Sequence, residues 1–204
     1  MTSASLAVPA RHSVLAESLP GTLTRSGTTI VLAVALTALA AQVSVPVPGS
    51  PVPVTGQTIA VLLTAAALGP ARGLAAQALY LAVGMAGLPV FASASHGASV
   101  VFGASGGYLV GFLAAAVLAG WGARHGADRS PLRTLLLFAV ASGAIYLIGT
   151  AWLCLDTGMT ASAGIAAGVT PFLPGDAAKA LLAAGLLPGA WWLAGRGAGN
   201  GNAR

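Results

Sequence analysis

The sequence predicts an all-α integral membrane protein with six transmembrane helices. Only 6% of its 204 residues are charged, 56% are hydrophobic, and the mean hydropathy is +0.87. Long apolar runs separated by glycine and proline complete a pattern that is typical of a chain embedded in lipid. The runs are continuous and do not alternate every second residue, which favours helices over the strands of a barrel.

Six apolar runs define the expected helices. They lie at about 28–45, 56–69, 71–87, 106–122, 134–155 and 175–195. The second and third runs are short for a hydrocarbon layer of about 30 Å, so we expect these helices to be tilted, broken or shielded by neighbours. Gly69, Pro70 and Gly73 interrupt these two runs, which argues against a single long helix.

The N-terminus allows a second interpretation. Arg25 precedes an apolar run that ends in Ala38-Leu39-Ala40, as in a cleavable signal peptide. Two observations argue against cleavage: the preceding tail is long and carries Glu17, and a topology of six spans is obtained without removing the first run. We therefore expect one membrane domain between two cytoplasmic tails, with the ranges 1–27 (flexible or interfacial), 28–195 (the membrane domain) and 196–204.

The arginines predict the orientation, because loops that stay cytoplasmic retain their basic residues. With six spans and both termini inside, every arginine falls on the cytoplasmic side, and the outer loops at 46–55, 88–105 and 156–174 contain none. The arginines are Arg11, Arg25, Arg72, Arg124, Arg129, Arg133, Arg196 and Arg204. A pI of about 10.4 therefore reflects membrane topology, and we expect no nucleic-acid partner.

Two faces of small residues suit close helix packing in lipid. The fourth run carries Gly103, Gly107 and Gly111, whose expected role is intramolecular packing. The first run carries Ala33, Thr37 and Ala41 at the same spacing. For this second face, internal packing and contact with a partner protein are both open.

Asp176 and Lys179 stand out because charge is scarce in the apolar runs. An ionised side chain in hydrocarbon costs at least about 2.5–3.5 kcal/mol, and it persists where it is paired or faces a polar cavity. At a spacing of three, with the acid first, the two side chains share one helical face in the order that favours pairing. Pairing explains how the charges are tolerated, whereas a pocket for a polar ligand also explains why they are present. Their place in the outer turns of the last run predicts a ligand that arrives from outside.

The outer loops supply candidate walls and covers for such a pocket. The prolines of PVPGSPVPV at 46–54 make a stiff loop, and Gln57 follows with an amide that either binds ligand or satisfies a helix terminus. The charge-free loop at 88–105 is long enough to be a lid. Aromatic candidates for apolar walls are Tyr80, Phe91, Phe102 and Tyr108, with interfacial anchoring as the alternative role.

Five segments carry a family resemblance, and they occur in the order VPVPGSPVPVTGQT, LGPARG, GLPVFA, GASGGYLVGF and PFLPGDAAKALLA. Together, over about residues 30–195, they resemble the BioY family, the biotin-specific substrate-binding (S) component of energy-coupling-factor (ECF) vitamin transporters. The resemblance implies a six-helix S-component bundle in the bacterial plasma membrane that captures biotin from the outer face. It also implies partnership with a transmembrane coupling protein and two cytoplasmic ATPases.

The resemblance matches Asp176 and Lys179 to the family's acid-x-x-Lys signature and so places both at the biotin site. In the resulting hypothesis Asp176 accepts a hydrogen bond from a ureido N–H of biotin. Lys179 either donates to the ureido carbonyl or neutralises the carboxylate of the ligand, and the loops at 46–54 and 88–105 close above it.

Two segments depart from the family pattern. Ala104-Ser105 stands where the resemblance predicts Pro-Thr before Gly-Gly-Tyr, which leaves the lid contacts open. In the first run, the face that the family uses to contact the coupling protein has Thr37 between Ala33 and Ala41. This departure bears on the strength of the contact with the coupling protein.

Other functions match the sequence less well. Gly103-Ala104-Ser105-Gly106 resembles the serine motif of rhomboid proteases, but that chemistry requires a histidine base, and His125 falls in a predicted cytoplasmic loop. Three scattered histidines and one cysteine predict neither a metal site nor a bound cofactor. Lys179 precedes alanine, so the chain lacks a P-loop, and if transport is driven by ATP the hydrolysis must come from partners; transport by the chain without partners stays open. An S component for another vitamin or small solute, and a subunit whose charged pair only packs, remain as alternatives.

Overall fold

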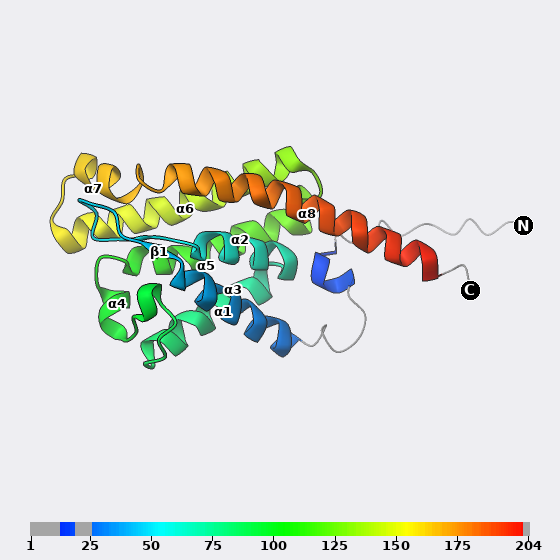
Figure 1. Ribbon diagram of the computed structural model, residues 1–204, viewed down its shortest axis with the longest axis horizontal. Coiled ribbons are helices and arrows are strands. Elements are labelled where there is room, and N and C mark those ends of the chain that lie inside the picture. The colour runs from blue at the N-terminus through cyan, green and yellow to red at the C-terminus, as the bar shows by residue number, and fades with distance from the viewer. Residues whose placement is uncertain (1–12, 19–25, 202–204) are drawn as a thin grey trace, which may run out of the picture.

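The computed structural model describes residues 13–18 and 26–201, which form a bundle of helices with one small hairpin (Figure 1). In chain order the elements are η1 (Leu15–Ser18), α1 (Ser26–Gln42), β1 (Ser44–Val45), β2 (Val54–Thr55), α2 (Gln57–Leu68), α3 (Pro70–Met85), η3 (Ala92–Ala94), α4 (Ala98–Phe102), α5 (Gly106–Arg124), η4 (Ala127–Arg129), α6 (Pro131–Thr157), α7 (Ala161–Gly168) and α8 (Leu173–Gly201). Arg11, Arg25 and Arg204, which entered the orientation argument, lie outside the described residues.

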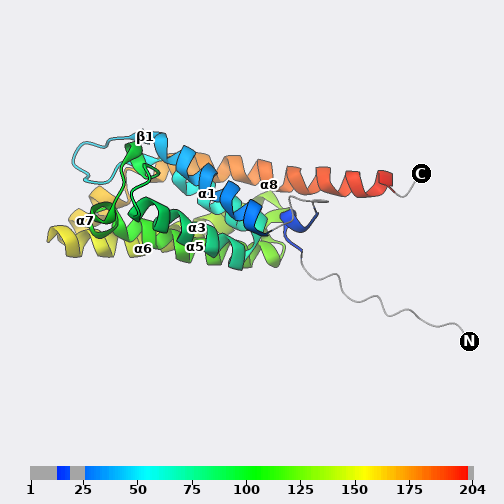
Figure 2. The ribbon, with the colours of Figure 1, turned by 90° about the horizontal axis from the view of Figure 1, so that it is seen from below.

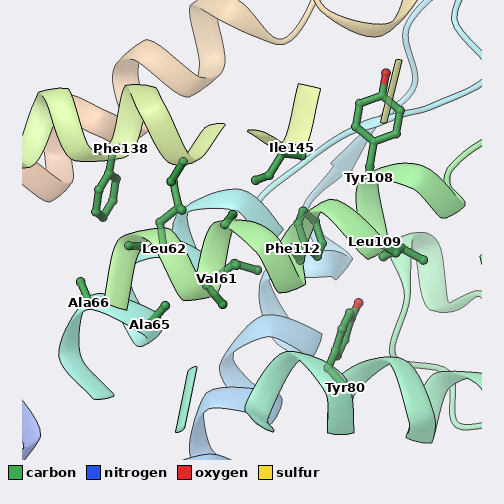
Figure 3. Close-up of a cluster of buried hydrophobic side chains, with 14 of the residues drawn as sticks. Val61, Leu62, Ala65, Ala66, Tyr80, Tyr108, Leu109, Phe112, Phe138 and Ile145 are labelled. Atoms are coloured by element: carbon green, nitrogen blue, oxygen red, sulfur yellow. The ribbon is translucent and has the colours of Figure 1, made fainter. Parts of the chain in front are cut away.

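Helix α5 forms the centre of the bundle. It packs against α6 and also contacts α2 and α3. Many of its buried residues are glycine and alanine, which let neighbouring backbones approach closely. Figure 3 shows the aliphatic side chains of α2 meeting Phe112 of α5 in this core, with Phe138 entering from α6.

The bundle has two distinct ends. The β1–β2 hairpin, α4 and α7 gather at one end, here called the hairpin end (Figure 1). Helix α8 runs beside α6 and continues past the other helices at the opposite end, near η1 (Figures 1 and 2). This opposite end is here called the η1 end.

Helix lengths agree with a membrane protein. Within residues 13–18 and 26–201, three helices are long and apolar enough to cross a membrane, namely α5, α6 and Leu173–Ala194 of α8. Helices α2 and α3 have 12 and 16 residues, or about 18 and 24 Å, so the second and third runs are short, as expected. Gly69 separates them at φ 85°, a left-handed conformation that suits glycine, and Pro70 starts α3 where its missing N–H costs nothing.

The structure corrects the end of the first run and the content of two loops. Helix α1 stops at Gln42, and the chain turns into an antiparallel pair in which Ser44 faces Thr55. The loop predicted at 88–105 contains η3 and α4, and the loop predicted at 156–174 contains α7. Thr160 caps α7 through a side chain that accepts from Ala163 N, a helix start signal that the sequence reading missed.

Both small-residue faces pack inside the chain, with one exception. A Cβ on Gly107 would lie 2.2 Å from Trp152 Cβ, and one on Gly111 would lie 2.9 Å from Ile145 Cα, so the two glycines let α6 approach α5. Gly103 is not on the same helical face, because it follows α4 and precedes the start of α5 at Gly106.

The small-residue face of α1 is covered by other parts of the chain. Ala33, Thr37 and Ala41 are 3%, 0% and 0% exposed. Thr37 Oγ1 donates to Ala33 O and accepts from Gln77 Nε2 of α3 at 3.4 Å. For these three residues the structure therefore supports internal packing, one of the two roles that the sequence left open.

The expected flexible N-terminal tail contains a segment that is packed against the bundle. Val14 is 0% exposed, and η1 contacts α2 and α8. Glu17 Oε1 lies 3.3 Å from Arg72 Nη2 and 3.8 Å from Arg124 Nη2. Burial of Val14 and neutralisation of the two arginines hold residues 13–18 at the η1 end, because the apolar contact and the charges act together.

Asp128 of η4 is buried at the η1 end. Its Oδ2 accepts a hydrogen bond of 2.6 Å from Trp191 Nε1 of α8, and the guanidinium of Arg129 lies 4.4 Å from the centroid of a Trp191 ring. Burial raises the pKa of the Asp128 carboxyl above its ordinary value, and the Trp191 hydrogen bond opposes that shift.

Candidate ligand-binding site

Asp176 and Lys179 form an ion pair on the first turns of α8. Lys179 Nζ lies 2.7 Å from Asp176 Oδ1, and their side chains are 17% and 11% exposed, respectively. Lys179 Nζ also donates to the backbone oxygen of Thr55 in β2 at 2.7 Å. The second carboxylate oxygen, Oδ2, accepts from the hydroxyl of Tyr146 on α6. The pair therefore joins α8 to the hairpin and to α6.

A cavity of about 220 Å³ adjoins this pair at the hairpin end. Its walls come from the hairpin, α2, α5, α6, the start of α8 and the segment before α4, and they are mainly apolar. The lining residues are Val52, Pro53, Thr55, Gln57, Thr58, Phe91, Ala92, Ser95, Val100, Ser105, Tyr108, Leu109, Phe112, Ile145, Tyr146, Phe172 and Asp176. Asp176 is the charged group among them, and its oxygens can accept further hydrogen bonds because a carboxylate has about four acceptor sites.

Lys179 lies behind Asp176 as seen from the cavity. It lines a small neighbouring space of about 10 Å³ together with Asp176 and Thr58. An ammonium has three donors, and Asp176 Oδ1 and Thr55 O accept two of them. Lys179 thus keeps the carboxylate neutralised from the side that faces away from the cavity.

Gln57 and Tyr80 belong to one chain of hydrogen bonds. Gln57 is 4% exposed; its Oε1 accepts from Thr55 Oγ1 at 2.8 Å, and its Nε2 donates to Tyr80 OH at 2.7 Å. The Tyr80 hydroxyl in turn donates to Val90 O at 2.8 Å. Gln57 lines the cavity, whereas Tyr80 stands outside its walls and supports the loop that carries Phe91.

Five aromatic side chains line the cavity, namely Phe91, Tyr108, Phe112, Tyr146 and Phe172. Tyr108 stacks on Phe172 with ring centroids 5.9 Å apart, and its hydroxyl donates to Gly168 O of α7 at 2.8 Å. Phe91, 1% exposed, meets Tyr80 edge-on at 5.4 Å. Figure 3 shows Tyr80 reaching toward α5 from α3 while Tyr108 leaves α5 on another side. Of the four aromatic candidates, Phe102 alone is largely exposed, at 64%, and it lies away from the cavity.

The sequence reading missed several lining residues. Tyr146 is the most important, because it lines the cavity and donates to Asp176. A hydroxyl inside the apolar run at 134–155 was an available signal, since polar groups in a span usually meet a partner. Ile145, Phe112 and Phe172 carried no such signal, because apolar residues occur throughout every run.

Within residues 13–18 and 26–201, no histidine lines the cavity with Ser105. Ser105 lines the cavity next to the start of α5, but His125 follows the last residue of this 19-residue helix, about 30 Å away along its axis. The His125 ring nitrogen Nδ1 lies 2.8 Å from Trp121 O. His96 is exposed and is not among the residues that line the cavity.

Comparisons with known proteins identify the family of the chain. A model of the BioY family matches residues 10–196. The chain is 35% identical over 155 residues to the biotin transporter BioY2 of Lactococcus lactis subsp. cremoris, covering 76% of this chain and 84% of that protein. It is 37% identical over 154 residues to a probable biotin transporter BioY of Pyrococcus horikoshii, covering 76% and 88%.

The fold is also known from a solved structure. It matches the crystal structure of the S component for biotin from an ECF-type ABC transporter with a TM-score of 0.71 and 22% sequence identity, covering 83% of this chain and 93% of that one. This match confirms the expected S-component fold. On the family match and the two relatives, the chain belongs to the BioY family.

Proposed function

We propose that this chain is a biotin-binding S component that captures biotin from the outer face of the membrane for uptake by an ECF transporter. The observation that carries the proposal is the mainly apolar cavity with a lysine-neutralised aspartate in its wall. Biotin combines an apolar bicyclic ring and tail with a ureido group that donates hydrogen bonds. Membership of a transporter family confirms the expectation that the chain is not an enzyme.

The proposed binding mode assigns different tasks to the two charged residues. Asp176 accepts from a ureido N–H, because its carboxylate lines the cavity and has acceptor sites beyond those used by Lys179 and Tyr146. Lys179 pairs with Asp176 and holds Thr55 through a hydrogen bond to its backbone oxygen. Tyr108 and Phe91 supply apolar walls for the ring and tail. Gln57 adds an amide at the same cavity, and Tyr80 supports it through their hydrogen bond.

We further propose six spans in a bacterial plasma membrane, with both termini in the cytoplasm. Helices α1, α2 and α3 supply the three spans beyond α5, α6 and α8. They are short for a membrane, and such helices are accommodated by local thinning of the bilayer or by packing against longer neighbours. The meeting of Arg72 and Arg124 on Glu17 at the η1 end supports a cytoplasmic assignment for that end. The cavity then opens toward the outside.

Energy for uptake is proposed to come from a transmembrane coupling protein with two ATPase subunits, since the sequence has no P-loop. The Ala33, Thr37 and Ala41 face is covered by the chain itself. A coupling protein would therefore meet the exposed apolar side of α1, where Leu36 is 47% and Leu39 is 69% exposed. The same side faces lipid when the chain is alone.

Equilibrium binding of labelled biotin to the purified chain tests the proposal. Asp176→Asn keeps the shape of the side chain and removes its charge, and Lys179→Met removes the ammonium. The matched control is Asp156→Asn, which changes an exposed acid at the hairpin end of α6. Loss of affinity in the two site variants, with the control unchanged and all three folded, is the expected result.

A panel of other vitamins addresses the main alternative, an S component with a different ligand. Wild-type protein that binds another vitamin or small solute in preference to biotin would assign the cavity to that ligand. Equal biotin binding by wild type and both site variants would move the biotin site away from Asp176.

A further inference from the structure

Gln42, the last residue of α1, binds the backbone of the second outer loop at two points. Its Nε2 donates to Phe91 O at 3.3 Å, and its Oε1 accepts from Ala94 N at 2.9 Å. The same Nε2 also donates to Ala38 O, one turn earlier in α1, at 2.9 Å, which fixes the direction of the amide. The side chain is exposed and lies outside the walls of the cavity.

The loop backbone between these two points is strained. Ser93 and Ala94 have φ values of 54° and 56°, in the left-handed region that is unfavourable for residues with a Cβ. Such conformations persist only where the surrounding structure holds them. Gln42 supplies two hydrogen bonds to this segment, one of them to the amide of Ala94 itself.

Phe91 connects the strained loop to the cavity. Its ring lines the cavity and sits over Gly84 of α3, where an added Cβ would lie 2.1 Å from the ring. The glycine therefore forms a notch that accepts the ring at this depth. When the loop moves away, the ring leaves the notch and one wall of the cavity opens.

We propose that Gln42 is a positioning residue that holds Phe91 in the cavity wall and thereby sets how long a bound ligand stays. The residue acts through the loop and does not touch the ligand. Without its two bonds the strained loop leaves its closed position more often, so the ligand dissociates faster. Association is not slower in such a variant, because entry also requires an open loop and the loop is open more often. This inference rests on the proposed function, in which biotin occupies the cavity.

The first test is the dissociation rate of labelled biotin. Gln42→Met keeps the length of the side chain and removes both hydrogen bonds, and we expect about tenfold faster dissociation with an association rate equal to or faster than that of the wild type. Gln42→Glu keeps an acceptor for Ala94 N and loses the donor to Phe91 O. Its dissociation rate should therefore lie between those of the wild type and Gln42→Met. Leu39→Met is the matched control, since Leu39 is 69% exposed one turn earlier on α1.

A second test needs no ligand. The Ala94 amide donates to Gln42, so its hydrogen exchange should speed up in Gln42→Met while exchange in α5 stays unchanged. Faster exchange at the loop with an unchanged biotin dissociation rate would overturn the proposed role. Unchanged exchange would overturn the positioning contact itself. Failure of the wild type to bind biotin would instead refute the proposed function, and the exchange result would still report on the contact.

Discussion

The ion pair at the cavity permits a direct separation of stability from binding. Lys179→Met leaves Asp176, whose side chain is 11% exposed, without its cation. Removing one member of a buried ion pair costs about 3–5 kcal/mol, whereas replacing both members by neutral groups is often close to neutral. We therefore expect Lys179→Met to be less stable than the double variant Asp176→Asn/Lys179→Met.

The magnitude follows from the burial and the contacts of the pair. Side-chain exposures of 17% and 11% favour the lower end of the range, about 3 kcal/mol for Lys179→Met. For a chain of this size that corresponds to a fall in Tm of about 6–12 °C. The double variant should lose about 1 kcal/mol, because the hydrogen bond from Lys179 to Thr55 O is still missing.

Thermal unfolding in detergent, followed by tryptophan fluorescence, measures the stability of each variant. Equilibrium binding of labelled biotin measures its affinity for the ligand. The double variant should unfold near the wild-type temperature and still bind biotin at least about tenfold more weakly, since it lacks the charged acceptor. A double variant that unfolds as early as Lys179→Met would refute the argument that the pair is a unit of stability. A double variant that binds biotin as well as wild type would refute the role of the carboxylate.

Three further predictions use other parts of the structure. Tyr146→Phe removes the hydroxyl that donates to the site carboxylate, so biotin affinity should fall about tenfold in an equilibrium assay with Tm unchanged. Gly149→Ala would place a Cβ 2.4 Å from the ring of Tyr108, so the free energy of unfolding should fall by about 1–3 kcal/mol, with a lower Tm and weaker biotin binding. Gly143→Ala is the control, because a Cβ there meets nothing within 4 Å, and it should change neither Tm nor biotin affinity. Burial raises the pKa of Asp128 above its ordinary 3.8, so its contribution to stability is present at pH below 3.8 and is lost as pH rises through the raised pKa. Asp128→Asn does not ionise, so its Tm minus that of wild type should increase as the pH rises through the raised pKa of Asp128.

The fold was readable from the sequence where composition alone decides, and less so where particular turns decide. Low charge and continuous apolar runs predicted a helical membrane bundle, and Gly69 with Pro70 predicted the break between α2 and α3. The hairpin, η3, α4 and α7 were missed, because short elements in uncharged loops depend on tertiary contacts more than on local pattern. The docking of Val14 was missed for the same reason.

The candidate site was predictable where a residue is chemically unusual for its surroundings. Asp176 and Lys179 are ionisable groups in an apolar run, and the structure brings them together beside a cavity. Gln57 and Tyr108 also line that cavity, whereas Tyr80 stands behind it. Hydropathy could not predict the covered face of Ala33, because the same alanine spacing serves internal packing and contact with another protein.

Pairing with lysine and binding of a ligand are compatible roles for the site carboxylate. The contact between Lys179 and Oδ1 of Asp176 is short, so the two charges neutralise each other, and insertion into the membrane does not leave an isolated charge. The lysine approaches from behind, and Tyr146 approaches Oδ2 from α6. Neither contact exhausts the acceptor sites that face the cavity. A ligand N–H can therefore be added without breaking the pair, and the affinity does not have to include the cost of separating two charges in a low-dielectric site.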